Sequence, residues 1–117
     1  MQTPLKVDFE SLQPSTPLTE EIRKELVRLE RLIPRVIGCH VVVREPHRHQ
    51  QSGRQFEIHV RVTVPGGEFV VSHNPPKSGY DDPYRAVRNA FNRVRRQYRE
   101  FVRKRRFVRR AVNGETS

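Results

Sequence analysis

The sequence predicts a single α+β domain, a four-stranded, mainly antiparallel sheet with two helices packed on one face. The 117 residues suit one domain, and a hydrophobic content of 34% supplies only one core. Short segments of alternating apolar and polar residues predict strands, and two longer segments with apolar residues three and four apart predict helices. The resulting order, β-α-β-β-β-α, favours one sheet covered by both helices.

The chain begins with a predicted strand and helix. Apolar and charged residues alternate over residues 5–10, so one face of that strand is expected to be buried. Thr19 is suited to cap a helix, since acids follow it at the positive end of the helix dipole. Apolar residues then recur at Ile22, Leu26, Leu29 and Ile33. Pro34 is expected to end or kink this helix. Because the helix connects the first two strands as a crossover, these strands are expected to be parallel neighbours.

Three further strands are expected in the middle of the chain. Residues 36–44 are apolar and β-branched, whereas residues 45–53 are polar and indicate a mobile loop. Residues 56–64 alternate most clearly, and a hairpin turn at residues 65–67 joins them to an antiparallel strand over residues 68–73.

A long helix follows the loop over residues 74–81. Asp82 is placed to cap it, and Pro83 fits its first turn. Its apolar seam consists of Tyr84, Val87, Phe91, Val94, Tyr98 and Phe101. The helix is expected to continue to about Val112 and to close at Asn113-Gly114. This gives one domain over residues 1–112 and a disordered tail over residues 113–117.

The net charge of +10 is concentrated in this last helix. Residues 1–82 contain eleven basic and eleven acidic residues, whereas residues 83–110 contain twelve basic residues and one acid, Glu100. A helix that needed charge only for solubility would mix acids with its arginines for ion pairing. The imbalance therefore indicates an acidic partner, with nucleic acid favoured.

Eight arginines share one arc of this helix, beside the apolar seam, when the residues are placed about 100° apart. They are Arg85, Arg88, Arg95, Arg96, Arg99, Arg103, Arg106 and Arg110. The row is about 35–40 Å long and is suited to several phosphates, because guanidinium binds phosphate through a planar fork. We therefore predict an RNA-binding edge on a rigid domain.

Two further surfaces each allow two interpretations. Lys24, Arg28, Arg31 and Arg35 share the solvent side of the first helix, where RNA contact and a solvated mixed face are equally compatible with the sequence. His59, Arg61 and Thr63 are expected on the sheet face away from the core. They are either a shallow RNA platform or ordinary exposed strand residues.

The remaining residues do not indicate catalysis, a cofactor, a metal or a small-molecule substrate. The five histidines lack the spacing of a zinc site, and Cys39 is expected to be a packed small residue. Asp81 and Asp82 resemble a carboxylate pair, but helix capping accounts for Asp82. The sequence has no signal peptide and no apolar stretch of membrane-spanning length, so we expect a non-enzymatic cytoplasmic protein without membrane contact.

The element order and the start of the last helix resemble the ribosome hibernation-promoting factor and ribosome-associated inhibitor family, short form. The similarity is carried by Asp82-Pro83-Tyr84-Arg85-Ala86-Val87, Ala90 and Arg96-Gln97. The start of the first helix and the spacing of Leu26 and Leu29 also fit, and the resemblance covers roughly residues 4–106. Arg88 departs from the family, which usually has an acid there.

The resemblance implies a stress factor that regulates translation by binding small-subunit rRNA in the decoding region and blocking mRNA and tRNA. A free monomer is expected, and any role in pairing ribosomes stays open because no second domain follows. The positions that match the family's RNA contacts are Lys24, Arg28, Arg31, Arg85, Arg88, Arg95, Arg96 and Arg99, to which the arc adds Arg103. The alternatives are a general double-stranded RNA-binding module and an interaction protein for an acidic protein or anionic membrane.

Overall fold

The structure is a computed structural model that describes residues 3–46, 55–75 and 82–116, with side chains as far as residue 105. Its elements follow the predicted order β-α-β-β-β-α. They are β1 (Leu5–Glu10), α1 (Thr16–Leu32), β2 (Gly38–Arg44), β3 (Glu57–Val64), β4 (Gly67–His73) and α2 (Pro83–Thr116). Most of the loop at residues 45–53 and of the loop at residues 74–81 lies outside the described residues.

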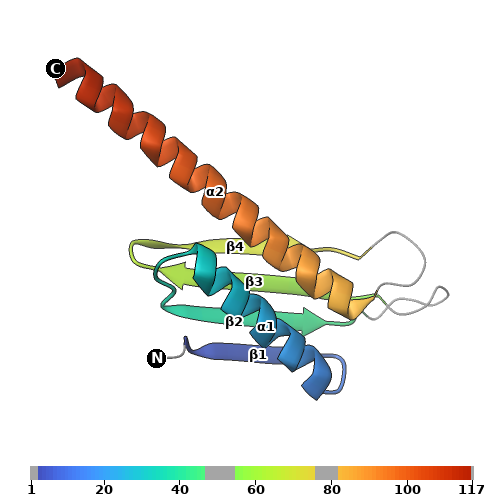
Figure 1. Ribbon diagram of the computed structural model, residues 1–117. Coiled ribbons are helices and arrows are strands. Elements are labelled where there is room, and N and C mark those ends of the chain that lie inside the picture. The colour runs from blue at the N-terminus through green and yellow to red at the C-terminus, as the bar shows by residue number, and fades with distance from the viewer. Residues whose placement is uncertain (1–2, 47–54, 76–81, 117) are drawn as a thin grey trace.

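The four strands form one sheet in the order β1-β2-β3-β4 (Figure 1). The pair β1–β2 is parallel and the other two pairs are antiparallel, as the crossover through α1 and the hairpin after β3 predict. Val7, Val41, Val60 and Val71 lie opposite one another across all four strands. This register turns the apolar side of every strand to the same face.

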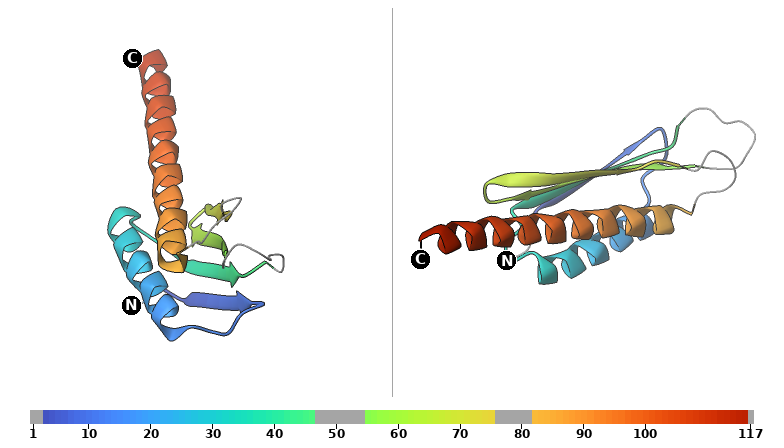
Figure 2. Two further views of the ribbon diagram at one scale, coloured as in Figure 1. Left: turned by 90° about the vertical axis from the view of Figure 1, so that its right-hand side faces the viewer. Right: turned by 90° about the horizontal axis from the view of Figure 1, so that it is seen from above.

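Both helices cover that apolar face and leave the other face open, as predicted. Figure 2 shows the two layers from above, with the helices on one side of the sheet. Ile22 and Leu29 of α1 and Phe91 of α2 are fully buried against Val41, Val60 and their neighbours. The core therefore lies between the layers, and the solvent-facing sides of the helices remain available for binding.

The start of α1 differs from the expected cap at Thr19. The helix begins at Thr16, and the side chain of Ser15 accepts a hydrogen bond from the Leu18 amide at 3.2 Å. Pro17 lies in the first helical turn, where backbone amides have no acceptor within the helix, so its lack of an amide proton costs no hydrogen bond. Thr19 is inside the helix, and its hydroxyl donates back to the Ser15 carbonyl at 2.9 Å.

The start of α2 is confirmed, and its end lies further along the chain than expected. The Asp82 carboxylate accepts a hydrogen bond from the Tyr84 amide at 3.0 Å, the geometry of an N-cap. The helix passes Val112 and the Asn113-Gly114 pair and runs to Thr116. The division into a domain over residues 1–112 and a tail over residues 113–117 stays a prediction.

Cys39 is buried on the core face of β2, and we expect its thiol to be unreactive in the native state. Burial raises the pKa of this thiol to about 12, and the nearby Glu30 carboxylate adds to the effect. At pH 8 the thiol stays protonated, so a dithionitrobenzoate reagent should react fully only when urea unfolds the chain. In the unfolded chain the cysteine thiol ionises above about pH 8.5. Burial of the neutral thiol therefore favours the folded state fully below that pH, and its contribution to the free energy of unfolding falls as the pH rises toward 12. Rapid labelling without urea would contradict the buried placement.

Candidate nucleic-acid interface

The two helices lie side by side and run in the same direction across the sheet (Figure 1). Two ion pairs between them set this arrangement: Arg88 Nη1 lies 3.6 Å from Glu21 Oε2, and Arg95 Nη2 lies 2.9 Å from Glu25 Oε1. The arginines on this edge of α2 therefore contact α1, whereas those further round the helix face solvent.

Glu25 is the buried centre of an ion triad that the sequence did not reveal. It is only 1% exposed, and each of its carboxylate oxygens accepts a hydrogen bond from one guanidinium. Arg28 donates to Oε2 from the same helix and Arg95 donates to Oε1 from α2, both at 2.9 Å. Arg95 also donates to the Asn92 side chain at 2.6 Å. The triad fixes α1 against α2 and keeps one net positive charge.

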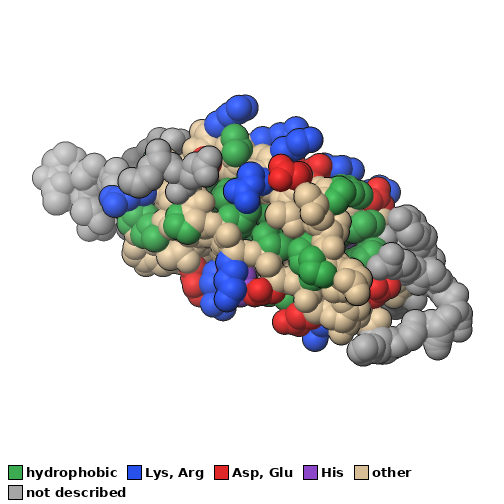
Figure 3. Space-filling view, turned by 90° about the horizontal axis from the view of Figure 1, so that it is seen from below, with side chains coloured by type: hydrophobic (Ala, Val, Ile, Leu, Met, Phe, Trp, Pro, Cys, Tyr) green, Lys and Arg blue, Asp and Glu red, His purple; other side chains and the backbone are tan. Residues whose placement is uncertain are grey.

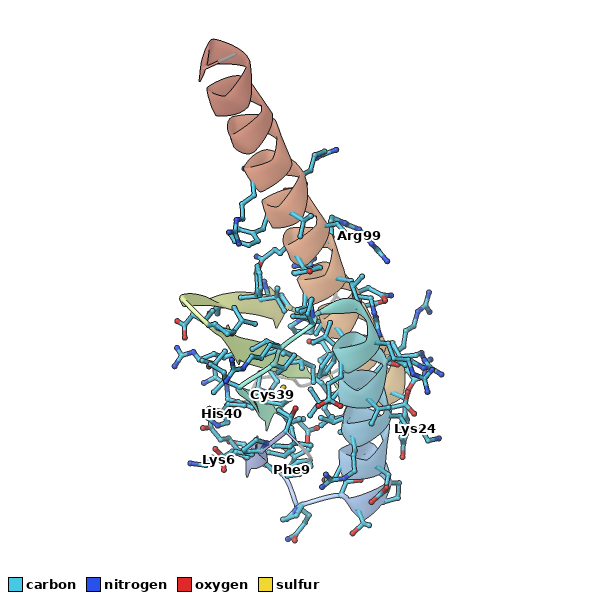
Figure 4. All side chains as sticks on the ribbon, turned by 60° about the vertical axis from the view of Figure 1, so that its left-hand side comes forward. Lys6, Phe9, Lys24, Cys39, His40 and Arg99 are labelled. Carbon is cyan, nitrogen blue, oxygen red and sulfur yellow. The ribbon has the colours of Figure 1, made fainter. Side chains whose placement is uncertain are left out.

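Six of the predicted cations are exposed and make no ion pair with any residue that the structure describes. They are Lys24 and Arg31 on α1, and Arg85, Arg96, Arg99 and Arg103 on α2. Together with Arg28 and Arg88, they form what we call the basic helix face. Figure 4 shows Lys24 and Arg99 extending from the two helices on the side away from the sheet, while Lys6 and His40 project on the opposite side.

A different side of α2 is fastened to the edge strand of the sheet. Arg93 donates to the carbonyl of Ser72 at 2.8 Å, and Gln97 donates to the carbonyl of Val70 at 3.3 Å. Both acceptors belong to β4, whose outer edge would otherwise present unpaired backbone groups. Arg93 therefore supports the position of α2 and does not belong to the basic helix face.

The open face of the sheet has a different pattern, in which basic side chains lie beside acids. His40 lies 2.7 Å from Asp8, and Arg61 lies 3.5 Å from Glu68. Arg44 makes two contacts with the Glu57 carboxylate, at 2.5 and 3.0 Å. Figure 3 shows basic and acidic side chains together on this side of the molecule, below a band of hydrophobic groups between the two layers. The pairing favours the ordinary solvated face over an RNA platform at His59, Arg61 and Thr63.

The structure places the nine predicted RNA-binding residues in two environments. Eight lie on the basic helix face, and Arg95 lies mostly inside the ion triad with a side chain only 16% exposed. The side chains of Arg106 and Arg110, which complete the predicted arc, lie outside the described residues. The RNA contacts of these nine residues stay a prediction.

Neither helix is both long and apolar enough to cross a membrane within the part of the chain that the structure describes. Within the same part, no three His, Cys, Asp or Glu side chains are grouped as a metal ion would need.

Comparison with known protein families gives a match over residues 5–106, to a family described as sigma 54 modulation protein / S30EA ribosomal protein. The chain belongs to this family. The match includes the four strands, α1, α2 as far as residue 106, and the whole basic helix face. The family expected from the start of the last helix is therefore confirmed.

Solved structures share the fold of this chain. A ribosomal subunit interface protein from Coxiella burnetii has a TM-score of 0.69 and 15% identity, and the match covers 85% of this chain and 97% of the other. The N-terminal domain of Thermus thermophilus Protein Y has a TM-score of 0.62 and 20% identity, with 86% and 99% covered. At these identities the likeness shows a shared fold. No curated protein sequence matches the chain significantly.

Proposed function

We propose that this member of the family is a ribosome-associated factor that binds small-subunit rRNA in the decoding region through its basic helix face. It prevents mRNA and tRNA from occupying the same place and so holds the ribosome inactive under stress, in the cytoplasm. The mechanism is occupancy, which requires neither catalysis nor a cofactor. We expect the free protein to be a monomer.

The observation that carries this proposal is the set of six exposed cations without ion-pair partners among the described residues. On the sheet face, acids neutralise Arg44 and Arg61, whereas the helix face keeps its charge for an external anion. Five of the eight cations of this face are arginines of α2 in a row, which matches phosphates spaced along an RNA backbone. The Coxiella relative is described as a protein of the ribosomal subunit interface, and this supports the ribosome as the source of that RNA.

Sedimentation tests the proposal. The purified protein is centrifuged through a sucrose gradient with small subunits, with large subunits and alone, each at low and moderate salt. We expect it to travel with small subunits at low salt. Its affinity should fall by about 10³-fold or more over a modest rise in salt if about six phosphates are contacted.

Competing RNA separates the proposed function from general duplex binding. An excess of random double-stranded RNA should leave the protein on the small subunit, because the ribosomal site presents a defined arrangement of phosphates. Equal loss to duplex RNA would favour the general RNA-binding module. A protein that stays at the top of the low-salt gradient would contradict ribosome binding altogether.

A further inference from the structure

An apolar pocket lies where α2 leaves the sheet, on a side of the helix that the basic helix face does not use. Its volume is about 380 Å³, within the usual range of roughly 300–1,000 Å³ for ligand pockets. The end of α1 and the loop after it, the β3–β4 hairpin and the stretch of α2 from Tyr98 to Arg105 enclose it. Figure 1 shows α2 continuing past the hairpin end of the sheet at this point.

Three aromatic rings form one wall of this pocket, which we call the aromatic pocket. Phe69 of β4 makes edge-to-face contacts with Tyr98, at 6.0 Å between ring centroids, and with Phe101, at 5.8 Å. These contacts fix the orientation of the Phe101 ring, although 44% of this residue is exposed. A large apolar ring held rigidly in solvent is a ready surface for stacking.

Two cations lie beside the rings. Arg35, after α1, and Arg105 of α2 both line the pocket, and the Arg105 guanidinium lies over the Phe101 ring, 5.5 Å from its centroid. Neither makes an ion pair with a residue that the structure describes. The pocket therefore offers a planar apolar surface with positive charge at its rim. Arg103 lies between Phe101 and Arg105 in the sequence, but about 160° away round the helix, on the basic helix face.

We propose that the aromatic pocket binds an unpaired nucleotide of the RNA that the basic helix face contacts. The base takes the place of the Arg105 guanidinium over the Phe101 ring, and its phosphate lies between Arg35 and the displaced Arg105. A paired base does not fit, because its faces are covered by its neighbours in the duplex, whereas unstacked bases bind aromatic side chains readily. An acidic peptide would match the cations, but it would leave the flat aromatic wall without a planar partner.

This inference rests on the proposed RNA binding and adds a preference for unpaired bases. The chain contains no Trp, so Phe101→Trp supplies a single fluorescent reporter inside the pocket. A hairpin RNA with one bulged nucleotide should quench this Trp, and a fully paired hairpin of equal length should not. Wild-type protein should also bind the bulged hairpin more tightly in fluorescence anisotropy.

Removing the ring gives the second measurement. Phe101→Ala should weaken binding to the bulged hairpin by about tenfold or more and leave binding to the paired hairpin unchanged, because one base loses its stacking partner. Val70→Ala is the matched control, since Val70 is 46% exposed on β4, outside both the aromatic pocket and the basic helix face. This control should bind both RNAs as the wild type does, and circular dichroism should show that both variants are folded.

The outcomes separate this inference from the proposed function. If small subunits still bind but Phe101→Ala has no effect and the Trp is not quenched, the nucleotide pocket is wrong and ribosome binding stands. If the bulge preference holds but the protein does not travel with small subunits, the pocket stands and the ribosomal role fails. Quenching by a glutamate-rich peptide and by neither RNA would assign the pocket to an acidic protein and overturn the inference.

Discussion

Replacement of Arg96, Arg99 and Arg103 by glutamine in one variant is expected to weaken binding to the small ribosomal subunit by about 100-fold or more. All three side chains are exposed and unpaired within the described part of the chain, so the change should remove phosphate contacts without disturbing packing. The loss corresponds to about 1 kcal/mol for each contact. The slope of log affinity against log salt should also become shallower, by roughly two to three. Filter binding over a series of salt concentrations measures both quantities.

The matched control removes the same charge from the open sheet face. A variant with Lys6, Arg44 and Arg61 all replaced by glutamine has the same net charge as the first variant, but these residues lie beside acids on the opposite side of the molecule. It should bind small subunits with nearly wild-type affinity and salt dependence. Equal loss in the two variants would mean that net charge, and not the basic helix face, drives binding.

Breaking the ion triad is expected to have the largest effect on stability. Arg95→Met leaves the Glu25 carboxylate buried with only Arg28 as a partner, and loss of one member of a buried ion pair costs about 3–5 kcal/mol. We expect a value near the lower end, about 3 kcal/mol, because Arg28 remains. Urea unfolding followed by circular dichroism gives the change in the free energy of unfolding.

Two further variants show whether the triad is the cause. Arg99→Met removes an exposed arginine from the same helix and should change the free energy of unfolding by no more than about 0.5 kcal/mol. The double variant Glu25→Leu with Arg95→Met removes the buried charge together with its partner and should recover most of the lost stability. If the double variant is as unstable as Arg95→Met alone, an unpaired buried carboxylate is not the reason.

The sequence was sufficient to predict the fold because each element carries its own periodic pattern. Alternation over β1 and β3 and the three-and-four spacing in both helices indicate which side of each element is buried, and one sheet with two helices buries all of them. The start of α1 was misplaced because Thr19 and the acids after it satisfy the same local preferences as Ser15. Capping preferences alone do not separate two such candidates four residues apart.

The positions of the cations on the two helices could be predicted in outline, and their division into free and paired cations could not. A helical wheel places Arg95 at the edge of the arc, but which acid it meets depends on how α1 packs beside α2. Glu25 follows Ile22 by three residues and so borders the apolar stripe of α1. This position alone does not predict a buried acid, because the burial of Glu25 and its contact with Arg95 depend on how α2 packs against α1. The aromatic pocket likewise arises from three separate segments, Phe69, the loop after α1 and the end of the seam at Phe101.

Competition with mRNA and tRNA on the small subunit tests the central proposal most directly. Small subunits are first loaded with a short mRNA and tRNA, then mixed with labelled protein and centrifuged at low salt. We predict that loaded subunits retain little protein, that empty subunits retain it fully, and that excess protein releases the tRNA. Full retention of both protein and tRNA on the same subunits would contradict binding in the decoding region.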